Sequence, residues 1–234
     1  ALSSAASDVY KRQPFLKDQI ELCEETNKFI LPISVDETAS QKIYRKHPKS
    51  EKTIIKGMSS TGVNELFATG DMLSTVLKDV FTDVNIYDND IRLLQYPFIS
   101  PISSSDAISF YKFYIMDTTF VDKDKCFHLT FVPNNSQDFG FTGHLYVLAD
   151  SSYTVKKCTM NLPKKSGVNF VDNMDIIQEF EQLPNGEWVL KTDDMIVEMT
   201  LMKIMQGFQI RRTTRYSDYA LSLIHISEPT RLRR

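Results

Sequence analysis

The stretch SFYKFYIMDTTFVDKDKCFHLTFV, Ser109–Val132, contains two runs of aromatic and β-branched residues separated by a charged DKDK turn. Residues of this kind favour strands, and side chains alternate between the two faces of a strand. Phe110 and Tyr114 fall on one face, while Phe113 and Ile115 fall on the other. A sheet with one wet face has polar residues at every second position. The pattern therefore predicts a strand that is covered on both faces.

The same two-residue period continues through the chain from Asn85 onward, with polar turns every 10 to 15 residues. The turn candidates are Asp122–Lys125, Pro133–Asp138, Ala149–Ser152, Leu162–Gly167, Leu183–Gly186 and Lys191–Asp194. Strands with short connections form antiparallel meanders, so Ile108–Met205 is predicted to be one continuous antiparallel sheet. Asn185–Gly186 gives the strongest hairpin signal, because Asn-Gly accepts positive φ angles. No alternation of strands and helices follows Asp106, which argues against a doubly wound parallel fold.

Helical spacing of apolar residues is found in the N-terminal part of the chain. It predicts a helix over Phe15–Phe29 and a clearer one over Val63–Val80. Between them, Ile33–Met58 is expected to be extended, with a turn in KHPKSEK around Pro48. The predicted fold class is α+β and β-rich, an antiparallel sheet with covering helices, and Val63–Val80 is the natural cover for one of its faces.

A candidate apolar groove follows from this arrangement. Its residues are apolar side chains of the predicted covering helix and of the facing strands: Leu66, Phe67, Leu73, Leu77, Phe170, Met174, Ile176, Met195 and Met199. Methionine fills irregular gaps in cores and also lines promiscuous apolar sites. Two interpretations therefore stay open, a core filled by side chains and an elongated pocket for an apolar ligand.

Residues that could carry catalysis are few. His128 and His144 lie in strand-like contexts, and a zinc site would need a third ligand that the spacing does not supply. Hydrogen-bonded strand histidines are the alternative interpretation. Asp193–Asp194 falls in a predicted turn, where solvated carboxylates are expected, and Gly140–Gly143 is expected to be a tight bend that opens a strand. We expect no enzyme site, no cofactor and no metal site inside this chain.

Three cysteines, Cys23, Cys126 and Cys158, form no C-x-x-C motif and no metal-binding spacing. Cys126 and Cys158 could form a disulfide if their strands were adjacent. Buried free thiols are the other interpretation, and the residue type favours it, because free cysteine behaves as a small apolar side chain.

Both ends of the chain are similar to translated sequencing-adapter DNA: SSAASDVYKRQ (Ser3–Gln13) and LSLIHISEPTR (Leu221–Arg231). We therefore expect residues 1–13 and 221–234 to be adapter-derived tails outside the fold, and residues 14–220 to be a gene fragment. Without the five basic and two acidic residues of the tails, 22 basic and 28 acidic residues remain, a net charge of −6. This charge disfavours nucleic acid as a partner. No apolar run approaches the roughly 20 residues of a membrane-spanning helix.

Three long phrases, Pro32–Gly62, Tyr96–Lys157 and Val168–Met195, resemble the central region of a family of Gram-negative outer-membrane proteins of unknown function. Members of that family have a carboxypeptidase-regulatory-like β-sandwich, then a region like this one, then a predicted membrane β-barrel. The resemblance implies a lipoprotein-carrier-like half-barrel, a curved antiparallel sheet with helices such as Val63–Val80 over its concave face. It also implies a place on the periplasmic side of the outer membrane, with the β-sandwich and the β-barrel as partners in the same chain. The family has no established catalytic residues, so the resemblance transfers none.

Three functions are compatible with these expectations. The first is a non-enzymatic periplasmic module of an outer-membrane β-barrel protein, with a role in envelope assembly or transport. The second is binding of a lipid or lipoprotein in the concave face of the sheet. The third is a hydrolase whose site lies outside the fragment.

Overall fold

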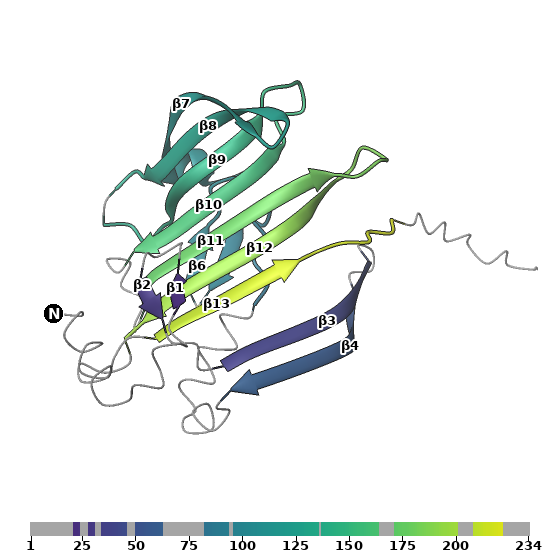
Figure 1. The fold of residues 1–234 in the computed structure, drawn as a ribbon. Coiled ribbons are helices and arrows are strands. Elements are labelled where there is room, and N and C mark those ends of the chain that lie inside the picture. The colour runs from purple at the N-terminus through teal and green to yellow at the C-terminus, as the bar shows by residue number, and fades with distance from the viewer. Residues whose placement is uncertain are drawn as a thin grey trace, which may run out of the picture. The chain divides into compact units, whose positions relative to one another are not determined.

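The computed structural model describes residues 21–23, 28–30, 34–45, 50–62, 82–93, 96–135, 137–163, 171–200 and 208–221. The chain divides into two compact units, Ala1–Ser74 and Thr75–Arg234, and each is described by itself. Figure 1 shows the strands of both units, labelled in chain order. The second unit contains the large sheet and the core discussed below.

Two antiparallel pairs make up the described part of the first unit. β1 (Glu21–Cys23) pairs with β2 (Lys28–Ile30), and β3 (Ser34–Arg45) pairs with β4 (Ser50–Gly62). The extended structure predicted for Ile33–Met58 is confirmed for Ser34–Arg45 and for the part of β4 up to Met58. The predicted break around Pro48 lies outside the described residues.

The helix predicted over Phe15–Phe29 is wrong in the part that the structure describes. Leu22 pairs with Phe29 in an antiparallel register, which a continuous helix would not allow. The prediction depended on three apolar residues at helical spacing. So short a pattern does not distinguish a helix from a pair of short strands. Residues 15–20 lie outside the described part of the chain.

The second unit is built around an open sheet of seven antiparallel strands (Figure 1). The strands are β7 (Tyr111–Val121), β8 (Asp124–Pro133), β9 (Thr142–Leu148), β10 (Val155–Pro163), β11 (Val171–Gln182), β12 (Trp188–Met199) and β13 (Phe208–Arg215). They follow one another in the order β13-β12-β11-β10-β9-β8-β7, so the sheet is a meander with β7 and β13 at its edges. The antiparallel sheet predicted over Ile108–Met205 is confirmed from Tyr111 onward in the residues described, and it extends further, to Arg215. Its predicted start is wrong, because Ile108–Phe110 belong to the short helix α3 (Ala107–Phe110).

The hairpin between β11 and β12 has the turn that its sequence predicts. Gly186 has a φ of +88°, a conformation that glycine adopts without a steric penalty. Its N–H donates to the carbonyl of Leu183 at 2.8 Å, and the N–H of Leu183 donates to the carbonyl of Glu187 at 2.8 Å. The hairpins predicted near Asp122–Lys125 and Ala149–Ser152 also connect consecutive strands.

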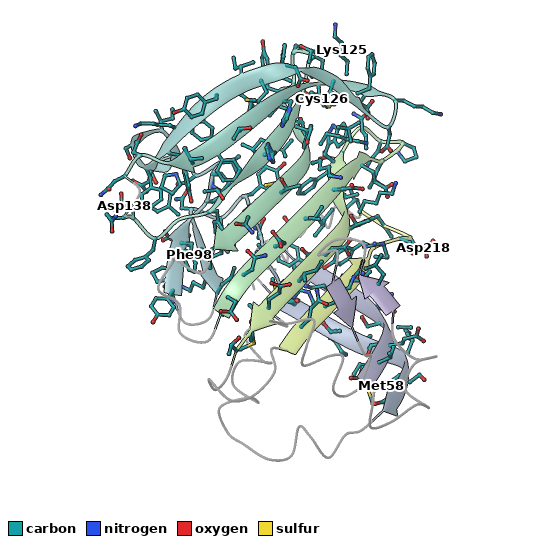
Figure 2. All side chains as sticks on the ribbon, turned by 60° about the vertical axis from the view of Figure 1, so that its left-hand side comes forward. Met58, Phe98, Lys125, Cys126, Asp138 and Asp218 are labelled. Carbon is teal, nitrogen blue, oxygen red and sulfur yellow. The ribbon has the colours of Figure 1, made fainter. Side chains whose placement is uncertain are left out.

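One face of the large sheet, here called the core face, carries the hydrophobic core of the second unit. Its cover comes from β5 (Asp90–Leu93), β6 (Tyr96–Ile99) and the chain just before them. Apolar side chains of this cover are buried together with those of the sheet: Val84, Ile86, Ile91, Leu93 and Phe98. Phe98 is labelled in Figure 2, and its ring lies 5.1 Å from the ring of Phe141. Each such large side chain stabilises the fold by about 1.5–3 kcal/mol on burial.

The described part of the chain contains one helix, α3 (Ala107–Phe110), which has four residues. The fold is therefore β-rich with almost no helix. The described residues of the segment 82–106 form strands and loops, and these cover the core face. The predicted helix Val63–Val80 lies outside the described residues. In the part that the structure describes, no helix is long and apolar enough to cross a membrane.

The prediction that both faces of Ser109–Val132 are covered is wrong for β7. Tyr114 is 51% exposed and Ile115 is 75% exposed, although they point to opposite faces. β7 is an edge strand, with β8 as its single hydrogen-bonded neighbour among the described strands. Alternation of side chains identifies the two faces of a strand, but it does not tell whether the strand lies inside a sheet or at its edge.

We predict that Gly143→Ala destabilises the second unit by about 3 kcal/mol, because the added methyl group would overpack the core at this position. A Cβ at Gly143 would overlap the carbonyl oxygen of Thr159 on β10 and would lie 3.1 Å from the ring of Phe131. Urea unfolding followed by the fluorescence of Trp188, the single tryptophan, measures the loss. The original chain is the reference, and an unchanged unfolding midpoint in Gly143→Ala would contradict the prediction.

Candidate functional site

The predicted apolar groove is described in part. Met174 and Ile176 on β11 and Met195 and Met199 on β12 are all fully or almost fully buried in one cluster on the core face. Ile176 lies directly opposite Met195 in the β11–β12 register. The other five predicted members, Leu66, Phe67, Leu73, Leu77 and Phe170, lie outside the described residues. The structure therefore brings four of the nine together.

Side chains of the cover lie in the same cluster as these four residues. Ile86, Leu93 and Phe98 are each at most 1% exposed. Tyr87, next to Ile86, packs edge-to-face against Phe180 with ring centres 5.7 Å apart. Around Met174 and Met195, the core face is thus covered by side chains of the chain itself.

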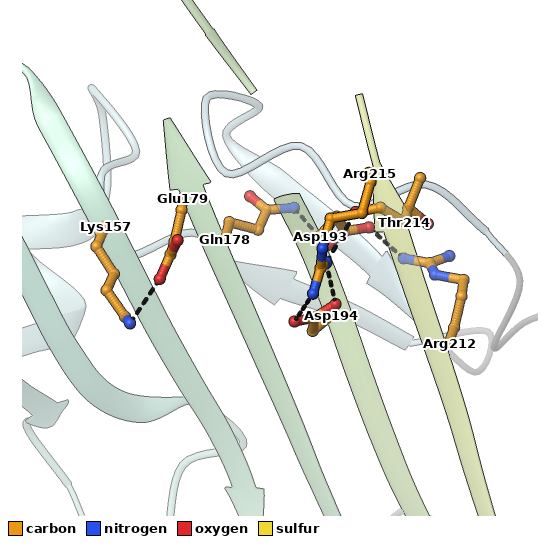
Figure 3. Close-up of polar contacts among 8 residues, drawn as sticks. All are labelled: Lys157, Gln178, Glu179, Asp193, Asp194, Arg212, Thr214 and Arg215. Carbon is orange, nitrogen blue, oxygen red and sulfur yellow. Dashed lines mark hydrogen bonds and ion pairs between the residues drawn. The ribbon is translucent and has the colours of Figure 1, made fainter. Parts of the chain in front are cut away.

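A buried polar network lies beside this apolar cluster, and Figure 3 shows it across β11, β12 and β13. The side-chain amide of Gln178 donates to Asp193 at 3.0 Å and to the carbonyl oxygen of Val84 at 2.8 Å. Arg212 forms an ion pair with Asp193 and donates to the carbonyl oxygen of Thr82 at 2.7 Å. Three strands and the chain that enters the cover are joined by these contacts.

The carboxylate of Asp193 is almost completely removed from water, at 1% exposure. Burial raises the pKa of this carboxyl above its usual value, and the hydrogen bond from Gln178 and the charge of Arg212 offset only part of that rise. A buried carboxylate without partners would be strongly destabilising. The amide and the guanidinium together keep the charged form acceptable inside the fold, and this fixes the position of Arg212 on the edge strand β13.

Sequence reasoning missed this network. It placed Lys191–Asp194 in a turn with solvated carboxylates, but these residues are internal to β12. Asp193 points to the core face and pairs with Arg212, while Asp194 points to the opposite face. The signal that could have identified the strand is the alternation of apolar residues at Met195, Val197 and Met199, extended backward by two positions to Asp193.

The opposite face of the sheet, here called the outer face, carries polar cross-strand pairs. Lys157 on β10 pairs with Glu179 on β11 at 2.7 Å, and Arg215 on β13 holds both oxygens of Asp194 at 2.6 and 3.1 Å. Figure 3 shows both pairs beside the buried network. Pairs of opposite charge across neighbouring strands stabilise a sheet by about 0.2–1 kcal/mol each.

A histidine cluster occupies the outer face over β7, β8 and β9. Nδ1 of His128 lies 3.0 Å from the carboxylate of Asp117, and its Nε2 lies 2.9 Å from Nδ1 of His144. Thr130 lies 3.0 Å from the same nitrogen of His144, and the ring of Tyr146 stacks on His128 with centres 4.8 Å apart. A carboxylate only accepts hydrogen bonds, so neutral His128 donates to Asp117 and accepts from His144.

This cluster matches the interpretation of His128 and His144 as hydrogen-bonded strand histidines. Chemically it can hold and pass one proton between two imidazoles, with Asp117 orienting the first of them. Burial, and after it the neighbouring His128, lowers the pKa of His144. Within the described ranges, no group of three or more histidine, cysteine or acidic residues is arranged to hold a metal ion.

An open depression of about 490 Å³ lies at the hairpin end of the sheet. It is lined by Asp122, Lys123, Asp124, Lys156, Glu181, Gln182, Trp188 and Lys191. The ammonium group of Lys156 lies 3.1 Å from Asp124, 3.5 Å from Asp122 and 5.4 Å from the centre of the Trp188 ring. Two carboxylates of the depression thus already neutralise the charge of this buried lysine, and these ion pairs join the residues that line it.

Cys126 and Cys158 are both free and buried, as the second of the two interpretations expected. Their strands, β8 and β10, are separated by β9, so a disulfide between them is not formed. Burial raises the pKa of both thiols, most strongly that of Cys158. Thiols of this kind are poor nucleophiles.

Comparison with known families gives one match. The model of a family of unknown function, DUF5686, matches residues 7–219, which is most of the chain. The resemblance to a family of unknown function is thereby confirmed. No curated protein matches the chain, and no solved structure matches it.

We predict that Asp193→Ala destabilises the second unit by about 3–5 kcal/mol, because it leaves the guanidinium of Arg212 buried without its carboxylate. Asp194→Ala, at the next position but on the outer face, should cost less than about 1 kcal/mol, since the charge of Arg215 is more than half exposed to water. Urea unfolding of both variants measures the difference. Similar losses of unfolding free energy in the two variants would show that the buried ion pair contributes no more to stability than the exposed one.

We also predict that His144 makes the fold less stable in mild acid. Its pKa is lowered in the folded chain relative to the ordinary value of 6.5, so the unfolded chain binds the proton more readily. The contribution of neutral His144 is complete above pH 6.5 and is lost as the pH falls below that value. Unfolding midpoints at about pH 7.5 and about pH 5.5 should differ less for His144→Gln than for the original chain. A variant that keeps the full pH dependence would contradict the prediction.

Proposed function

The chain belongs to the family of unknown function DUF5686, and from that premise we propose that it is a non-enzymatic module of an outer-membrane β-barrel protein. In this proposal it lies on the periplasmic side of the outer membrane and acts in envelope assembly or transport. Its partners are a preceding β-sandwich and a following membrane β-barrel of the same protein. The long phrases of sequence that resemble such proteins support this arrangement.

The observation that carries the proposal is the packing of the core face. Met174, Ile176, Met195 and Met199 are buried against the chain's own cover, and the network around Asp193 fixes that cover to three strands. A site that must admit a ligand needs room or a cover that opens. An interior that is occupied by the chain's own side chains and fixed by buried polar contacts supports a rigid structural module.

The proposed fold in finer detail is a lipoprotein-carrier-like half-barrel. Lys156 on β10 contacts Asp124 on β8 and Trp188 on β12, two strands away on either side. Neighbouring strands are about 4.8 Å apart, so a flat sheet would separate β8 from β12 by roughly 19 Å. One lysine on the middle strand that contacts side chains of both outer strands supports a curved sheet.

The complete gene tests the proposal. We predict that the reading frame continues beyond residue 220 into segments of about ten residues with alternating apolar side chains, the pattern of membrane β-strands. Upstream of residue 14, the same frame should encode a β-sandwich. Amplification of the flanking DNA from the source sample provides the sequence. A stop codon shortly after the codon of residue 220 would overturn the proposal.

A second candidate, lipid binding on the concave face, is favoured by a different observation. Phe127 on β8 lies on the core face, in the same alternation as Leu129 and Phe131, yet it is partly exposed. Phe120 and Ile115 on β7 share that face and are 68% and 75% exposed. The cover described above therefore leaves an apolar area at this end of the sheet, which suits an acyl chain.

Titration with a fluorescent long-chain fatty acid distinguishes the two functions. The structural module should give no saturable change in fluorescence. The lipid binder should give saturable binding in the micromolar range that Phe127→Asp abolishes. Phe139→Asp is the control, because Phe139 is an even more exposed phenylalanine that lies outside the strands of the sheet. Saturable binding that only Phe127→Asp removes would make lipid binding the better function.

A further inference from the structure

The edge strand β7 has features of an association surface. It is 11 residues long and pairs with β8 on one side, whereas its other side has no neighbouring strand among those described (Figure 1). Apolar and aromatic side chains along it are largely exposed: Tyr114, Ile115, Met116 and Phe120. Monomeric proteins usually shorten, charge or cover such an edge, because its free N–H and C=O groups invite another strand.

The register with β8 tells which side chains of β7 share a face. Tyr114 lies opposite Thr130 and Asp117 lies opposite His128, both on the outer face, although their separation of three residues would put them on opposite faces of a regular strand. The shift occurs at a β-bulge between Ile115 and Asp117, where Met116 is the extra residue. Lys112, Tyr114 and Asp117 therefore point to the outer face, and Phe113 and Ile115 point to the core face.

We propose that β7 pairs with β7 of a second copy of this chain, antiparallel and around a two-fold axis at Tyr114, to form one continuous sheet. With Tyr114 opposite Tyr114 of the second copy, Phe113 lies opposite Ile115. Met116 bulges out of the new ladder as it does out of the ladder with β8, and Lys112 then lies opposite Asp117. Each of these pairs occurs twice and joins residues of the same face. The strand is thus complementary to itself, as an isologous interface requires.

The charged residues of β7 favour a second copy of the chain as the partner and favour the register centred on Tyr114. Lys112 forms no ion pair within the described part of the chain, and the side chain of Asp117 is 63% exposed beside His128. A single lysine on an edge strand normally discourages pairing with another chain. In the proposed dimer, Asp117 of each copy lies opposite Lys112 of the other copy. The two lysines therefore form two ion pairs and do not oppose the pairing of the strands.

Neighbouring registers lack this match. A shift of one step places Ile115 on the axis and puts Lys112 opposite Thr119, which has no charge. A further step places Asp117 on the axis opposite Asp117 of the second copy, where like charges repel. Only the register centred on Tyr114 satisfies both charged residues of the strand interior.

Exchange of the two charges tests the proposal by sedimentation velocity over a range of concentrations. The original chain should form a dimer of twice 26.9 kDa. Lys112→Asp and Asp117→Lys should each weaken it about tenfold or more, because each places like charges opposite one another at two positions. The double variant should return to within about threefold of the original Kd, because both ion pairs are restored in reverse. Asp117→Asn keeps an acceptor for His128, and it should weaken the dimer less than Asp117→Lys.

Cross-linking tests the register without changing a charge. Tyr114→Cys should form a disulfide-linked dimer rapidly on mild oxidation, since the two β-carbons meet at the axis. Thr119→Cys, on the same strand and face, should cross-link slowly, and both variants carry Cys23→Ser so that the cysteines that remain beside the new one, Cys126 and Cys158, are buried. A monomer at all concentrations, single charge variants without effect, a double variant that stays weak, or equal cross-linking at both positions would overturn the proposal. A larger assembly with a different chain, unaffected by the charge variants, would mean that another strand occupies the edge.

Discussion

The buried carboxylate of Asp193 is the constraint on which the arrangement of the second unit depends. It needs a cation and a hydrogen-bond donor close by, and these come from Arg212 on β13 and Gln178 on β11. Both partners also bind carbonyl oxygens of the chain before β5, at Thr82 and Val84. The same few contacts therefore fix the last strand to the sheet and the cover to the core face.

This constraint makes the two ends of the sheet different. Near β11, β12 and β13, the cover is held down, and the methionine-rich core beneath it is dry. Near β7 and β8, the described cover does not reach the hairpin end, so Phe120 and Phe127 remain partly exposed on the same face. Both candidate functions use this asymmetry, because a rigid module needs the locked end and a lipid site would need the open one.

Local patterns predicted the part of the fold that local physics determines. The two-residue period and the turn at Asn185–Gly186 identified the meander. A buried strand face requires alternating apolar residues, and a positive φ angle favours glycine, so both can be recognised in the sequence. The strand character of Lys191–Asp194 was missed, because two adjacent carboxylates suggest water when the partner on β13 is not yet known. The structure places the described groove residues of β11 and β12 on one face, and their cover comes from residues 84–99, which no short-range pattern connects to them.

The error on β7 is informative for a physical reason. Apolar residues on both faces of a strand indicate that both faces are shielded from water, and for an interior strand the shielding comes from the same chain. An edge strand can obtain part of that shielding from a chain that is added beside it, because side chains of both faces then pack against the neighbour's side chains across the new ladder. The exposure of Tyr114 on one face and of Ile115 on the other is what such an edge shows before its partner is bound. A two-sided apolar pattern thus keeps its meaning in an edge strand, with a second copy of β7 supplying the contacts that the single chain lacks.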